Sequence, residues 1–92
     1  MIFGKAHNLE FSKITDQIYL GNNMCCGLHF KSLQDLGISA DVDLEETQLE
    51  KPEGIEVYLW LPVKDNTAPN QAQLVVGTKV INDMVKAGKK VY

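Results

Sequence analysis

Residues 55–92 read IEVYLWLPVKDNTAPNQAQLVVGTKVINDMVKAGKKVY, and this stretch contains the pattern that decides the fold. Residues 55–63 have the length and β-branched and aromatic content of a strand, with apolar bulk on both faces, which predicts an interior strand of a sheet. Apolar residues then recur every three or four positions over residues 70–87, as in an amphipathic helix. Residues 88–92 predict a glycine helix stop and the start of another strand. This order of elements indicates an α/β layout.

The helix expected over residues 70–87 has a signal at each end. Asn70 and Gln73 have the spacing of a capping box, in which each side chain bonds the other residue's backbone. Gly88 follows the last helical residues, where a glycine ends many helices. Gly77 lies inside the helix and costs about 1 kcal/mol there relative to alanine. We therefore expect Gly77 where the helix packs closely against a neighbour.

The preceding half of the chain contributes three more predicted strands and another helix. Residues 9–14 and 17–20 are expected to form short strands around a polar turn, and residues 38–44 alternate apolar and polar side chains as a strand does. Between them, the apolar spacing predicts a helix over residues 24–36, which ends at Gly37. The fold class expected is therefore α/β, with a mostly parallel twisted sheet flanked by helices.

The overall composition is that of one small globular domain. The chain has 92 residues, of which 45% are hydrophobic and 23% charged, and it has no low-complexity segment. Its net charge of −3 argues against a nucleic-acid or anionic-membrane surface. The chain contains no apolar run of membrane-spanning length, and its first residues lack the pattern of a signal peptide. We therefore expect a cytoplasmic protein without nucleic-acid or membrane partners.

The cysteines and basic residues restrict the chemistry. Cys25 and Cys26 are adjacent, and neighbouring cysteines bridge each other only with strain. Neither is followed by a glycine-rich anion loop, and zinc would need ligands beyond His29 and His7, so we interpret both cysteines as structural. All nine basic residues are lysines, so no guanidinium can clamp a phosphate in two places. We expect neither a metal nor a cofactor.

Other polar and aromatic side chains have structural interpretations. Asp43, Glu45 and Glu46 could bind a hard cation, but a solvated loop edge is the preferred interpretation. Tyr58 and Trp60 could stack on a ligand ring, yet on an interior strand they are expected to be core aromatics. Three lysines lie near the end of the second helix: Lys86, Lys89 and Lys90. They are expected to complement its negative end.

Five pieces of the sequence, in this order and spacing, resemble the dual-specificity branch of the cysteine-dependent protein tyrosine phosphatases. The pieces are ITDQIYLGN (14–22), LQDLGIS (33–39), VDLEE (42–46), GIEVYLWLPVKDNTAP (54–69) and GKKVY (88–92). They cover most of the chain, although each piece alone has low specificity. One departure is Asp41, which stands where the family usually has an apolar strand residue. This departure predicts weaker burial of that strand face.

The resemblance implies an activity and a role for one residue. In that family, a strand of the GKKVY type leads into a loop of His-Cys, five residues and Arg. The thiolate attacks phosphorus, the loop amides and the Arg hold the phosphate oxygens, and an Asp on another loop protonates the leaving oxygen. By position, that general acid is Asp65. The implied reaction is hydrolysis of phosphotyrosine, and of phosphoserine or phosphothreonine, through a cysteinyl-phosphate intermediate and without a cofactor.

The chain ends where the signature loop would begin. Residues 1–92 are therefore expected to form a partial, C-terminally incomplete phosphatase-like domain that has the general acid but lacks the nucleophile and the Arg. Such a chain is expected to be inactive alone, and its implied partner is a phosphoprotein or another phosphomonoester. Without the resemblance, Asp65 would be interpreted as a turn or cap carboxylate. The alternatives are a non-catalytic interaction module, which could self-associate through an incomplete sheet edge, and another small α/β ligand binder.

Overall fold

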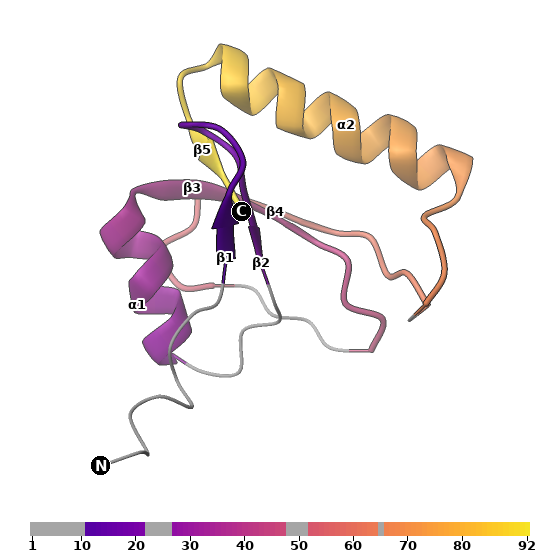
Figure 1. Cartoon of the computed structure of the whole chain (residues 1–92), viewed down its shortest axis with the longest axis horizontal. Coiled ribbons are helices and arrows are strands. Elements are labelled where there is room, and N and C mark those ends of the chain that lie inside the picture. The colour runs from indigo at the N-terminus through magenta and orange to yellow at the C-terminus, as the bar shows by residue number, and fades with distance from the viewer. Residues whose placement is uncertain (1–10, 22–26, 48–51, 65) are drawn as a thin grey trace.

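A mixed α/β arrangement makes up the described part of the chain, with one helix on each side of a parallel sheet (Figure 1). The computed structural model describes residues 11–21, 27–47, 52–64 and 66–92. The elements are β1 (Phe11–Lys13), β2 (Tyr19–Gly21), α1 (Gly27–Leu36), β3 (Ile38–Asp43), β4 (Val57–Trp60), α2 (Gln71–Lys86) and β5 (Lys90–Val91). Each predicted element is present, and β4 is clearly shorter than the predicted strand over residues 55–63. Residues 9–10 and 24–26, where two of the predicted elements begin, lie outside the described part.

The main sheet has three parallel strands in the order β4-β3-β5. Ala40 of β3 lies opposite Val57 on one side and opposite Val91 on the other. Ile18, immediately before β2, forms a parallel bridge to Val91, which joins the antiparallel β1–β2 hairpin to the sheet. The predicted α/β class with parallel strands is confirmed. β5 lies between β3 and the Ile18 segment, so it has a backbone neighbour on each side.

β4 is an edge strand in the described structure, so the prediction of an interior strand is wrong. Val57–Trp60 pairs only with β3 among the described residues. One face of β4 carries the aliphatic residues Val57 and Leu59, and the other carries Tyr58 and Trp60, whose polar groups remain hydrogen-bonded. The Tyr58 hydroxyl donates to Asp43, and Trp60 Nε1 donates to the Glu45 carbonyl at 2.6 Å. Trp60 is 36% exposed, so it is not the core aromatic that the sequence suggested.

The predicted features of α2 are confirmed. Asn70 and Gln73 form the capping box, and Gly88 follows the helix in the left-handed region with φ of 77°. Gly77 is buried, and a Cβ atom placed on it would lie 3.2 Å from Leu61 Cδ1. The absence of a side chain at this position therefore lets α2 approach the segment that follows β4.

The core beneath α1 is small and is made by residues from several elements. Tyr19, Leu33 and Ile38 are its buried members, and Phe30, Leu36, Ile55 and Tyr92 pack against them. α1 ends at Gly37, whose φ of 78° confirms the predicted glycine stop. Neither helix of the described residues is long and apolar enough to cross a membrane.

Two of the three lysines near the end of α2 bond groups outside this helix, so the expectation that all three complement its end is wrong. Lys86 does lie in the last turn of α2. Lys90 Nζ instead donates to the Leu36 carbonyl at 3.1 Å, at the C-terminal end of α1. Lys89 forms an ion pair with Glu56 at 3.3 Å. Once the chain turns back into β5, its side chains are carried away from the helix that precedes it.

Candidate functional site at the carboxyl edge of the sheet

The loops that follow β3 and β4 leave the sheet at the same edge because these strands are parallel. Their backbones remain paired past the strand ends: Leu61 N–H donates to the Asp43 carbonyl at 2.8 Å, and Val63 N–H donates to the Leu44 carbonyl at 3.3 Å. Open parallel sheets usually bind ligands at this edge. The predicted general acid, Asp65, belongs in sequence to the second of these loops.

A tight turn lies within the loop after β4. Thr67 donates its N–H to the Lys64 carbonyl at 3.1 Å, and its hydroxyl donates to the same oxygen. Asn66 has φ of 62°, in the left-handed region that asparagine tolerates better than most residues. Asp65 lies between these residues in sequence but outside the described part of the structure. Its role as general acid therefore stays a prediction.

The side chain of Gln73 ties both ends of this loop to the first turn of α2. Its Nε2 donates to the Pro62 carbonyl at 2.7 Å, where the loop begins. Its Oε1 accepts the Asn70 N–H at 3.0 Å, where the loop ends, and Asn70 Oδ1 accepts the Gln73 N–H at 2.9 Å. One amide therefore connects residues 62 and 70. The capping box was predicted, but the bond to Pro62 was not, since it depends on how α2 packs.

Asp43 organises the end of β3, which the sequence interpretation missed. It is 6% exposed, so the expectation of a solvated acidic edge is wrong for this residue. Its Oδ1 accepts the Glu45 N–H at 2.8 Å, and its Oδ2 accepts the Tyr58 hydroxyl. Hydrogen bonds to its charged oxygens offset the cost of burial. Asp41 is 2% exposed, so the predicted weaker burial of this strand face is also wrong.

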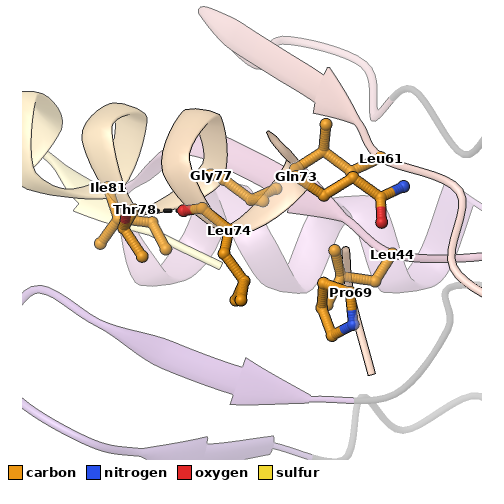
Figure 2. Close-up of a pocket in the computed structure, with 9 residues that line it drawn as sticks. Leu44, Leu61, Pro69, Gln73, Leu74, Gly77, Thr78 and Ile81 are labelled. Carbon is orange, nitrogen blue, oxygen red and sulfur yellow. Dashed lines mark hydrogen bonds between the residues drawn. The ribbon is translucent and has the colours of Figure 1, made fainter. Parts of the chain in front are cut away.

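An apolar groove of about 120 Å³ lies beside the loop, between α2 and the ends of β3 and β4 (Figure 2). Leu44, Leu61 and Leu74 contribute much of its lining. The hydroxyl of Thr78, which also lines it, donates to the Leu74 carbonyl at 2.6 Å within the helix. Such a lining suits an apolar group rather than a phosphate, so the groove is not the phosphate site implied by the resemblance.

Most of the other residues considered as ligands from the sequence lie outside the described structure. Cys25, Cys26 and His7 lie outside the described residues, and the structure describes only the backbone of His29. Within the described ranges, no three His, Cys, Asp or Glu side chains are grouped so as to hold a metal ion.

The arrangement at the carboxyl edge is therefore a loop that Gln73 anchors at both ends, with one acidic residue in its sequence, and a hydrogen-bonded Asp43 at the end of the neighbouring strand β3. It can present a side chain of that loop towards whatever binds at the edge. No known family model matches the chain, and no curated protein matches it.

Proposed function

We propose that this chain contributes the general-acid part of a phosphatase active site of the dual-specificity, cysteine-dependent kind. The observation that carries the proposal is the loop of residues 62–70, which lies at the carboxyl edge of a parallel sheet and is tied at both ends by Gln73. The sequence of this loop is part of the longest piece of the resemblance. Asp65 would protonate the leaving oxygen while a cysteine thiolate attacks phosphorus.

The position of β5 also supports the proposal. The pairing of β3 with β5 continues through Tyr92, whose N–H donates to the Ala40 carbonyl at 2.9 Å and whose carbonyl accepts the Val42 N–H at 2.9 Å. A loop that followed Tyr92 would therefore leave the sheet beside β3, at the same edge that bears the 62–70 loop. A helix N-terminus there would favour the anionic phosphate and a low-pKa thiolate.

The substrate class under this proposal is a phosphomonoester, with phosphotyrosine, phosphoserine or phosphothreonine in a protein as the expected form. Hydrolysis would proceed in two steps. The thiolate displaces the alcohol or phenol to form cysteinyl phosphate, and Asp65 gives its proton to the leaving oxygen. Water then attacks the phosphocysteine, with the same carboxylate accepting its proton, which releases phosphate and restores both groups.

Residues 1–92 alone are expected to hydrolyse p-nitrophenyl phosphate no faster than buffer does. The chain has no arginine and no sequence match to the nucleophile loop, so it lacks the groups that hold the phosphate. The measurement is release of p-nitrophenol by the purified chain, with the Cys25→Ser/Cys26→Ser double variant assayed beside it. A clear rate retained in the double variant would show catalysis without any cysteine, which would overturn the proposal.

A non-catalytic interaction module, which could include self-association, is the second candidate. β4 pairs on only one side among the described residues, and α2 exposes Leu74, Val75 and Val76. Unpaired strand backbone and exposed apolar residues both favour association. The coding sequence beyond Tyr92 separates the two candidates. A stop codon there favours the module, whereas a strand continuing into His-Cys, five residues and Arg supports the phosphatase.

A further inference from the structure

Gln73 makes one more contact than a helix cap requires. A glutamate at this position could also accept the Asn70 N–H, and glutamate is the usual partner in a capping box. A carboxylate could not at the same time donate to the Pro62 carbonyl, whereas the Gln73 amide accepts the Asn70 N–H at 3.0 Å and donates to Pro62 at 2.7 Å. The Nε2 group of Gln73 therefore bonds the loop, whereas its Oε1 atom bonds the helix cap.

The Pro62 carbonyl lies where the chain leaves the sheet and the loop begins. Leu61 and Val63 both donate to β3, so Pro62 between them turns its carbonyl away from β3, towards Gln73. The next backbone bond to β3 is the one from Val63 to Leu44, at 3.3 Å, and the Lys64–Thr67 turn follows directly. The bond from Gln73 thus holds the chain where pairing with β3 is weakening and the turn begins.

We propose that Gln73 is a positioning residue that fixes the 62–70 loop against α2 and thereby sets where the acid in that loop is presented. This inference rests on the proposed function for the role of Asp65, but the anchoring itself is a property of the described residues. Two attachment points on one side chain shorten the free part of the loop. The stretch that remains between them contains the Lys64–Thr67 turn, which has its own hydrogen bond.

The test is Gln73→Glu in the 92-residue chain, since this variant keeps the acceptor for Asn70 and removes only the donor to Pro62. Gln71→Glu is the matched control, because it makes the same charge change at an exposed position in the same helical turn. Amide hydrogen exchange is measured at Val63 and Thr67. We expect exchange there to rise roughly 5- to 10-fold in Gln73→Glu, as one hydrogen bond is lost, with no change in Gln71→Glu.

The amide of Leu74, which donates to Asn70 at 3.0 Å in the first turn of α2, reports whether the helix survives. Equal exchange at Val63 and Thr67 in both variants, with Leu74 still protected, would overturn the positioning role. If Gln73→Glu fails to fold, NMR of the Gln73 side chain in the unmodified chain tests the same contact. The Gln73 side-chain NH₂ should be protected and should show contacts to Pro62 in NMR spectra, whereas a freely exchanging NH₂ would also overturn it.

The two proposals fail in different ways. If the coding sequence continues into an active phosphatase, Gln73→Glu should lower kcat several-fold for phenyl phosphate and much less for p-nitrophenyl phosphate, with KM unchanged. A fully active enzyme in which Asp65→Asn has no effect would remove the acid role and leave the anchoring result intact. If Asp65→Asn lowers kcat but Gln73→Glu changes neither exchange nor kcat, the acid role of Asp65 stands and the positioning role of Gln73 is overturned.

Discussion

At the scale of single residues, the structure gives Asp43 a role that the sequence pattern concealed. Three acidic residues close together after a strand resemble a solvated edge, and periodicity alone does not show that one of them accepts hydrogen bonds from Tyr58 and Glu45. The pairing of β3 with β4 sets Tyr58 opposite Asp41, two residues before Asp43 on the same face, and the Tyr58 hydroxyl reaches the Asp43 carboxylate diagonally across the two strands. A buried acidic residue is therefore recognised only when its cross-strand neighbour is known.

Asp43→Ala is expected to lower the free energy of unfolding by about 2–3 kcal/mol, because it leaves the Tyr58 hydroxyl and the Glu45 N–H without their acceptor. Urea unfolding followed by circular dichroism measures the change. Asp35→Ala is the control, since Asp35 is exposed and pairs with Lys31 at 3.3 Å on the surface of α1. That control should change stability by no more than about 0.5 kcal/mol. Equal effects of the two variants would contradict the role given to Asp43.

At the scale of elements, local signals located the helices better than the strands. The ends of α2 were predictable because a capping box and a glycine stop act within a few residues of the helix. The edge position of β4 was not predictable, because strand order depends on long-range pairing. The apolar character of IEVYLWLPV fits an interior strand and an edge strand equally well. The bond from Gln73 to Pro62 was unpredictable for the same reason, since it joins residues from two elements.

Gly88→Ala is expected to destabilise the chain by about 1 kcal/mol through its backbone alone. The residue has φ of 77°, and no atom lies within 4 Å of the place a Cβ would occupy, so a methyl group there meets strain but no clash. The midpoint of thermal unfolding measures the effect. Gly88→Asn should cost less than Gly88→Ala, because asparagine adopts this conformation more readily. A Gly88→Ala variant as stable as the parent would show that the left-handed helix end is not required.

At the scale of the whole molecule, the sequence was sufficient for the α/β class, and the structure added the strand order. The parallel pairing of β3 with both β4 and β5 makes the carboxyl edge the natural place for a ligand, and the 62–70 loop lies there. The apolar groove beside α2 had no signal in the sequence, because its lining comes from segments that are far apart along the chain. The activity is a proposal that depends on Asp65 and on a nucleophile and a phosphate-binding Arg that residues 1–92 do not contain.

The most direct test of this proposal is the effect of Asp65→Asn on leaving-group dependence, measured in the protein translated from the coding sequence past Tyr92. A general acid matters most for a poor leaving group, so kcat should fall about 100-fold or more for phenyl phosphate. It should fall much less for p-nitrophenyl phosphate, whose leaving group needs little protonation. Equal losses for the two substrates, or no loss for either, would contradict the assignment of Asp65 as the general acid.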